Sequence, residues 1–102
     1  MTADETIALA YNALAHPRRA RLFRLLSIEP EAGRSFGSLL LATGFAKAAL
    51  KHHIDVMEKG GLIRRRRHGN FVAFVLTPGS LSSAMAQVQR LGRVTQNADF
   101  DA

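Results

Sequence analysis

The spacing of apolar residues predicts helices over the first 59 positions of the chain. Apolar side chains recur every three or four residues over 6–14 and again over 17–27, as expected for helices that bury one face. Two further helices are predicted over residues 36–42 and 46–59, and Gly44 between them suits the left-handed residue that follows a helix end. The last two helices are close enough in sequence to form a helix-turn-helix.

Beyond residue 61 the period of the pattern falls to two, which is typical of strands. Two runs rich in strand-forming residues, 62–68 and 71–76, flank Gly69-Asn70, a pair suited to a two-residue hairpin turn with glycine at its first position. A last helix is predicted over 81–93. Residues 95–102 show no pattern and are expected to be a disordered tail.

The order of these elements predicts a mainly α fold with a β-hairpin (α+β). We expect about five helices and a two-stranded wing, in a single domain over residues 1–102. A helix-turn-helix over 36–59 that is followed at once by a hairpin over 62–76 is the order of a winged helix-turn-helix.

Charge indicates the class of partner. The chain has 14 Lys and Arg against 8 Asp and Glu, a net charge of +6. Residues 18–67 hold twelve of the basic residues and four of the acidic ones, a net charge of +8 over that stretch. A basic middle in a small domain predicts a polyanionic partner, double-stranded DNA first. No stretch is long and apolar enough to cross a bilayer, and no membrane partner is expected.

Several kinds of chemistry are absent from the sequence. There is no cysteine, which excludes disulfides, thiolate metal sites and thiol redox switches. No nucleophile elbow, phosphate-binding glycine loop or usefully spaced carboxylate pair is present, so we expect neither an enzyme nor a cofactor. The acidic N-terminus does not match a secretory signal, and a cytoplasmic location is expected.

Three stretches resemble, in the right order, the ArsR/SmtB family of bacterial winged helix-turn-helix repressors. Residues 13–26 resemble the family's opening motif, with the letters ALAHPRRARLFRLL. Residues 50–63 resemble its recognition-helix signature and residues 65–76 its wing. The resemblance covers about residues 6–93. It implies a homodimeric repressor that binds operator DNA and releases it on a signal.

The resemblance and the charge together select the candidate DNA-binding residues. Two recognition helices of a dimer would enter successive major grooves of a pseudo-palindrome, and the wings would reach the flanking backbone or minor groove. Four consecutive wing arginines alternate between two faces, so they do not all share one role, and a merely solvated edge strand is the alternative for them. The candidates are Arg18, Lys47, Ala48, Ala49, Lys51, His52, Arg65, Arg66, Arg67, Gly69 and Asn70.

The start of the recognition helix departs from the family pattern. The family usually has Ser or Thr at several positions there, whereas this chain has Ala46, Lys47, Ala48 and Ala49. Alanine can touch a thymine methyl group but makes no hydrogen bond to a base edge. A sequence-indifferent, architectural DNA-binding protein of the nucleoid type is therefore the alternative function, and the ratio of specific to non-specific affinity distinguishes the two.

Histidines and the last helix bear on metal control. His52 and His53 point about 100° apart on a helix and do not suit one ion, so we expect no metal site there. His53 lies beside the apolar stripe and is predicted to be structural, whereas His52 is predicted to face DNA. For His16 and for His68 we expect a role at a helix start or on the surface. Residues 81–93 contain no Asp, Glu or His, so the family's metal control does not transfer. Control by an organic effector or a protein partner stays open.

Apolar stripes on the two terminal helices predict a homodimer. A chain of this length buries a modest core alone, so a second copy can complete it. The resemblance implies that the helices over 6–14 and 81–93 form the interface, although the stripes could also belong to the core of one chain. The candidate interface residues are Ile7, Tyr11, Leu14, Leu81, Met85 and Val88.

Overall fold

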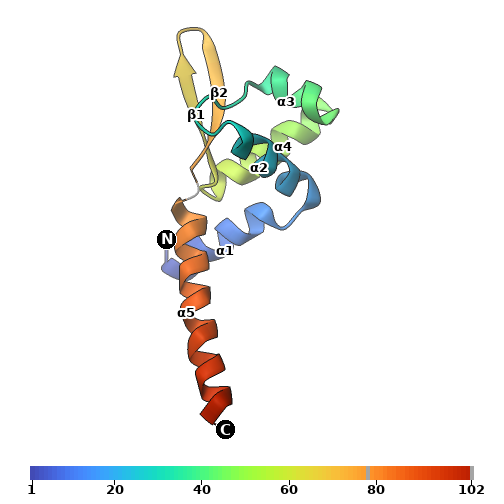
Figure 1. Ribbon diagram of the computed structural model, residues 1–102. Helices are drawn as coiled ribbons and strands as arrows, with labels where there is room; N and C mark the ends of the chain where they lie inside the picture. Colours follow the sequence, from blue (N-terminus) through green and yellow to red (C-terminus); the bar gives the residue numbers. More distant parts are fainter. Residues whose placement is uncertain (78, 102) are drawn as a thin grey trace.

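The computed structural model describes residues 1–77 and 79–101. Over these residues the fold class is as predicted, with five helices and one two-stranded hairpin (Figure 1). In chain order the elements are α1 (Ala3–Leu14), α2 (Pro17–Ile28), α3 (Phe36–Thr43), α4 (Lys47–Lys59), β1 (Ile63–His68), β2 (Phe71–Leu76) and α5 (Gly79–Asp101).

The predicted end of the last helix is wrong. The sequence pattern ends this helix at Arg93 and predicts a disordered tail over 95–102, whereas α5 continues to Asp101. The reason is that no proline or glycine follows Gly92 to stop a helix. Ala102 lies outside the described residues.

The core lies where α2, α3 and α4 meet the base of the hairpin. Its fully buried large side chains come from all three helices and from the segment before β1, because each helix has an apolar stripe. On α4 the stripe is Leu50, Ile54 and Met57, at the spacing that places side chains on one helix face. The other fully buried large residues are Leu22, Leu26, Leu39 and Leu62.

Helix α1 approaches the end of α4 so closely that only glycine fits there. A Cβ atom on Gly60, the residue after α4, would lie 2.5 Å from Cβ of Ala13 and 2.8 Å from the backbone oxygen of Leu9. Ala10 and Ala13 of α1 are fully buried. The two small side chains and the glycine thus set how near the first helix lies to the fourth.

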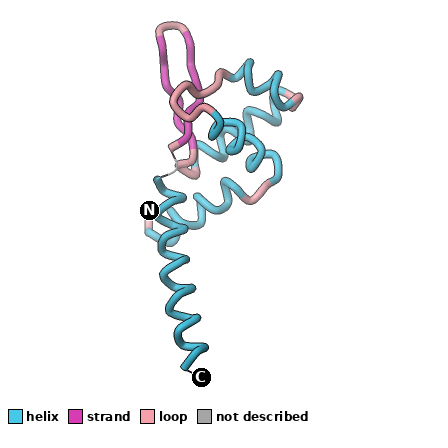
Figure 2. The backbone as a smooth tube through the Cα atoms, in the orientation of Figure 1, coloured by secondary structure: helices cyan, strands magenta, loops and turns pink. Residues whose placement is uncertain are grey.

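The hairpin is antiparallel and projects from the helical body (Figure 2). Its register runs from Ile63 opposite Leu76 to His68 opposite Phe71. The turn has Gly69 at its first position with φ 56°, as the Gly-Asn pair predicts. The hairpin and α5 extend in opposite directions from the body in Figure 1, and the molecule measures 58 × 26 × 25 Å.

Candidate nucleic-acid interface

Helix α4 divides into a buried face and a basic exposed face. The buried face is apolar apart from His53. On the other face, Lys47 and His52 are exposed, and the side chain of Lys51 is 71% exposed. The N-cap residue, Ala46, makes no side-chain hydrogen bond to the helix. The first turn of α4 therefore presents one lysine between alanine side chains.

The wing presents two different faces, because side chains alternate along each strand. Arg65 lies opposite Phe74 in the register, and Arg67 lies opposite Val72. Both arginines consequently share one face of the hairpin. That face adjoins α4, since a cavity of about 290 Å³ is lined by side chains of α3, α4 and both strands, Arg65 included. The exposed cations of α4 and the wing form a basic surface that Asp55, paired with Lys51, interrupts at this junction.

Arg65 is held against α4 by two carboxylates. Its Nε and Nη2 atoms donate to both oxygens of Glu58 at 3.0 to 3.2 Å, and Nη2 lies 3.8 Å from Oδ1 of Asp55. Its guanidinium carbon lies 5.4 Å from the ring centroid of Phe74. The hydrogen bonds that Arg65 donates to Glu58 raise the pKa of its guanidinium group above the usual value. Lys51 donates to Asp55 at 2.8 Å, and this bond lowers the pKa of that carboxyl.

The other three wing arginines differ from Arg65 and from one another. Arg66 donates from Nη2 to the backbone oxygen of Ala32 at 3.1 Å, and its Nε is buried without a hydrogen-bond partner among the described residues. Arg64 and Arg67 are exposed. Of the predicted contact residues, those that are exposed are Arg18, Lys47, Ala48, Lys51, His52, Arg65, Arg67, Gly69 and Asn70, while Ala49 and Arg66 are half-buried.

A buried arginine joins α1 to α4, and the sequence analysis missed it. Arg19 is 7% exposed. Its Nε donates to the backbone oxygen of Ala13 at 2.9 Å, and Nη2 donates to that of Asn12 at 3.1 Å. Its Nη1 lies 3.2 Å from Nδ1 of His53 on α4. A signal was available, because Arg19 stands three residues before Leu22 on the buried stripe of α2.

Three of the four histidines lie where the sequence predicts them, and His52 remains a candidate DNA contact. His53 is 5% exposed, and burial lowers its pKa below 6.5, as does the electrostatic effect of His16 and Arg19. His16 is the N-cap of α2, where its Nδ1 accepts from the backbone N–H of Arg18 at 3.1 Å. His52 and His68 are exposed.

Arg18 lies at the start of α2 next to the turn before α4. Its guanidinium carbon lies 5.1 Å from the ring centroid of Phe45, and that of Arg21 lies 5.6 Å from the same ring. Arg21 also donates to the backbone oxygens of Ala42 and Thr43 at the end of α3. Two cations of α2 therefore border the helix-turn-helix without belonging to it.

The terminal helices pack on each other and leave part of their apolar stripe exposed. Leu81 is 5% exposed and belongs to the core of the single chain, so it has little surface left for a partner. Leu14 is half-buried against the same core. Tyr11, Met85 and Val88 are 37%, 47% and 52% exposed. A cavity of about 350 Å³ between α1 and α5 includes the remaining candidate, Ile7, in its lining.

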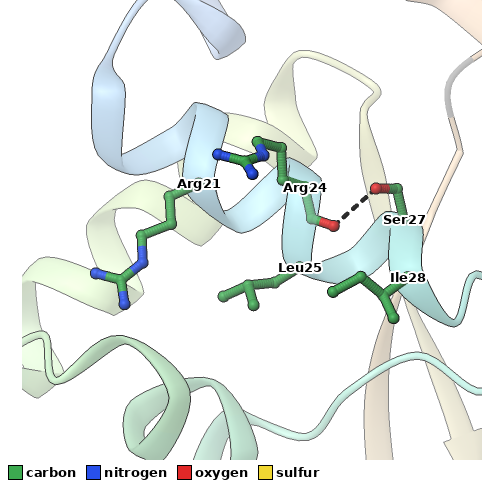
Figure 3. Close-up of a pocket in the computed structure, with 5 residues that line it drawn as sticks. All are labelled: Arg21, Arg24, Leu25, Ser27 and Ile28. Carbon is green, nitrogen blue, oxygen red and sulfur yellow. Dashed lines mark hydrogen bonds between the residues drawn. The ribbon is translucent and has the colours of Figure 1, made fainter.

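An open groove of about 390 Å³ lies along α2 (Figure 3). Leu25 and Ile28 supply its apolar surface, and the side chain of Ser27 donates to the backbone oxygen of Arg24 at 2.7 Å. Arg21, at the other end, is already engaged with the end of α3. The groove brings together no set of polar groups that suits catalysis.

The described part of the chain has neither a membrane-spanning helix nor a cluster of metal ligands. No described helix is long and apolar enough to cross a bilayer. No group of three or more His, Asp or Glu side chains in the described part of the chain is arranged to hold a metal ion.

Sequence comparison supports the interpretation of α3, α4 and the hairpin. A model of the helix-turn-helix domain matches residues 14–66. The chain is 28% identical over 82 residues to Rv0081, an uncharacterized HTH-type transcriptional regulator of Mycobacterium tuberculosis, covering 79% of this chain and 69% of the relative. The crystal structure of Rv0081 superposes with a TM-score of 0.61 over 89% of this chain and 90% of that one.

Two further solved structures share the fold at lower identity. An ArsR-like transcriptional regulator from Rhodococcus sp. RHA1 has a TM-score of 0.81 at 18% identity, covering 92% of this chain and 86% of that one. The homodimeric winged helix-turn-helix DNA-binding domain of Mb0332 from Mycobacterium bovis has a TM-score of 0.67 at 22% identity, covering 92% and 84%. At these identities, the similarity shows a shared fold only.

Proposed function

This chain belongs to the helix-turn-helix domain family, as an ArsR-like winged helix-turn-helix transcriptional regulator, and from that premise we propose that it is a dimeric repressor of a pseudo-palindromic operator. The observation that carries the proposal is the basic surface formed by α4 and the wing. Lys47 and Lys51 extend from the exposed face of α4, and Arg67 extends from the hairpin face that adjoins it. A helix in the major groove with a basic hairpin beside it accounts for this placement.

The three basic residues have different roles in this proposal. Lys47, in the first turn of α4, is placed to read base edges, because recognition helices contact bases near their N-terminal ends. Arg67 binds the flanking phosphates or the minor groove, with Gly69 and Asn70 at the tip of the wing. Lys51 is paired with Asp55, which partly neutralises its charge, so Lys51 contributes less to DNA binding.

The experiment compares one operator with random DNA of the same length. A genomic footprint of bound sites supplies the operator. Arg67→Ala should weaken binding to both DNAs and lower the salt slope by about 1.8, because the dimer loses two phosphate contacts. Lys47→Ala should change the preference among operator variants. Equal losses on both DNAs for both variants would contradict sequence-specific recognition.

Such a result would support the alternative function, an architectural DNA-binding protein without sequence preference. The observation in its favour is the composition of the first turn of α4, where Ala46 and Ala48 are exposed and offer no hydrogen bond to a base edge. An architectural protein keeps the salt dependence but has a ratio of specific to non-specific affinity near one, whereas specific binding gives ratios of about 10³ or more.

The dimer in this proposal forms through the terminal helices. Tyr11, Met85 and Val88 leave apolar surface exposed, and α5 extends away from the body so that a second copy can pack along it. The Mb0332 domain, which shares the fold, is homodimeric, and this supports a dimer. Two-fold symmetry would then set the two recognition helices about one turn of DNA apart.

Sedimentation of a charged variant tests the dimer. Met85→Glu places a charge in the proposed interface and should give monomers at micromolar concentration. Ala86→Glu, exposed on the same helix, adds the same charge outside the stripe and should leave the dimer intact. A stable monomer of the unmodified chain at that concentration would overturn the dimer.

Control of this repressor does not depend on metal or thiol chemistry in our proposal. The support is the lack of cysteine in the sequence. An organic ligand or a protein partner is the remaining class of effector, and the cavity between α1 and α5 is one place for a ligand. Operator titrations with zinc, arsenite and peroxide test this: a tenfold change in affinity in any of them would contradict it.

A further inference from the structure

Asp55 and Glu58 are acidic residues on a surface that otherwise attracts phosphate. They are two of only four acidic residues between 18 and 67, and both lie on α4 next to the wing. A carboxylate near DNA repels the backbone and weakens association. Their contacts show what they do instead. Glu58 bonds to one arginine of the wing, Arg65, while Asp55 accepts a hydrogen bond from Lys51 and has its other oxygen 3.8 Å from Arg65.

Arg65 is engaged on several sides of its guanidinium group. Two of its nitrogens bond to both oxygens of Glu58, the bidentate geometry that fixes orientation as well as distance. The plane of the group lies over the ring of Phe74 on β2, and Asp55 lies at 3.8 Å. The side chain therefore connects the last turn of α4 to both strands of the hairpin.

Arg67 provides the contrast within the same strand. It lies two residues further along β1, on the same face, and it is exposed. No carboxylate is paired with it among the described side chains. One strand thus carries one arginine held by α4 and one that is available to a ligand.

We propose that Glu58 is a positioning residue, which holds Arg65 away from the phosphates and thereby sets the angle of the wing against the recognition helix. The inference rests on the proposed DNA-binding function and deepens it. With Arg65 held in this way, the wing contacts DNA through Arg67, and its distance from α4 is matched to one groove spacing. Sequence specificity depends on that match, whereas non-specific attraction does not.

Glu58→Gln separates these two contributions. Each chain of the variant dimer gains one positive charge and releases its Arg65 to the phosphates, so non-specific affinity should rise and the salt slope should steepen by about 1.8. Release of the wing should lower the ratio of specific to random-DNA affinity about threefold to fivefold, the range expected for one well-ordered exposed ion pair. Glu31→Gln, exposed and without a side-chain partner among the described residues, makes the same charge change and should leave the ratio unaltered.

Arg65→Gln supplies the decisive second measurement. If Glu58 holds Arg65 off the DNA, the variant loses specificity with no change of salt slope beyond that of Arg24→Gln, an exposed control with the same charge change. A slope lower by about 1.8 than in this control would show that Arg65 of each chain binds a phosphate, and would overturn the proposal. So would a ratio for Glu58→Gln equal to that of Glu31→Gln. Failure of the unmodified chain to bind any DNA would instead refute the proposed function, and the inference with it.

Discussion

Two arginines contact the recognition helix α4 from different parts of the chain, and their surroundings differ. Arg19 reaches α4 from α2 and is 7% exposed, whereas the side chain of Arg65 reaches it from the wing and is 55% exposed. Arg19 bonds to two backbone oxygens at the end of α1 and to neutral His53. Arg65 bonds to the carboxylate of Glu58.

Because the two arginines differ in burial, Arg19 affects folding stability and Arg65 affects DNA-binding specificity. At Arg19 the loss of the side chain removes a partner from two buried groups, the oxygen of Ala13 and the ring of His53, which is costly. At Arg65 water and salt ions can replace the carboxylate, so the pair contributes little to folding. The Arg19 contact therefore holds α1 and α4 together, and the Arg65 contact adjusts the wing. The following predictions test that division.

The largest effect is expected from Arg19→Met. Methionine keeps much of the aliphatic stem but removes every donor, so the buried oxygen of Ala13 and the buried Nδ1 of His53 lose the bonds that Arg19 supplies. The oxygen of Asn12 keeps its bond from the backbone N–H of Ala15. We expect a loss of about 2–4 kcal/mol in the free energy of unfolding, measured by urea denaturation at fixed chain concentration. Arg24→Met, exposed on the same helix, is the control and should stay within about 0.5 kcal/mol of the unmodified chain. Equal losses of stability for Arg19→Met and Arg24→Met would contradict a special stabilising role of the buried arginine.

A moderate effect is expected from acid, through His53. Its pKa is lowered from 6.5 in the folded chain, so below pH 6.5 the unfolded chain takes up a proton that the folded chain does not. Stability is therefore unaffected by this group above pH 6.5 and falls as the pH drops below that value, by at most about 1.4 kcal/mol per pH unit. The charged and titratable groups that act on the ring are all basic: His16, Arg18, Arg19 and His52.

Two variants isolate that contribution. His53→Gln removes the titrating ring and keeps an acceptor for Arg19, so the fall in stability below pH 6.5 should be shallower than in the unmodified chain. His68→Gln changes an exposed ring at the end of β1 and should leave the fall as it was. Unfolding curves between pH 7.5 and 5 measure this. If the free energy of unfolding depends on pH identically in the unmodified chain and in His53→Gln, His53 is not the group that causes the loss of stability in acid.

The sequence predicted the elements because each depends on local signals. Apolar spacing located the helices, and Gly69-Asn70 located the hairpin turn. The burial of His53 followed from its place beside Leu50 and Ile54 on α4. These features need only residues within a few positions of each other, which periodicity and turn chemistry describe well.

Local signals in the sequence could not predict the contacts of Arg19 and Arg65, for different reasons. Arg19 bonds to a residue 34 positions away, and a charged side chain is rarely expected inside a core. Arg65 was predicted to touch DNA because it stands in a basic run, and only the packing of the wing against α4 places Glu58 and Asp55 beside it. Charge counts do not reveal which cations are already paired. That DNA contact stays untested, and the inference about Glu58 argues against it.

The smallest effect on stability is expected at the Arg65–Glu58 pair. A double-mutant cycle with Arg65→Gln and Glu58→Gln should give a coupling energy of about 0.5 kcal/mol in the free energy of unfolding, as for other exposed ion pairs. At 1 M salt the screening length falls to about 3 Å, and the coupling should nearly vanish. The loss caused by Arg19→Met should persist at that salt, because Ala13 and His53 are buried and none of the partners of Arg19 is charged. A coupling above about 2 kcal/mol that resists salt would instead make the wing contact a folding contact like that of Arg19, and the division between the two arginines would fail.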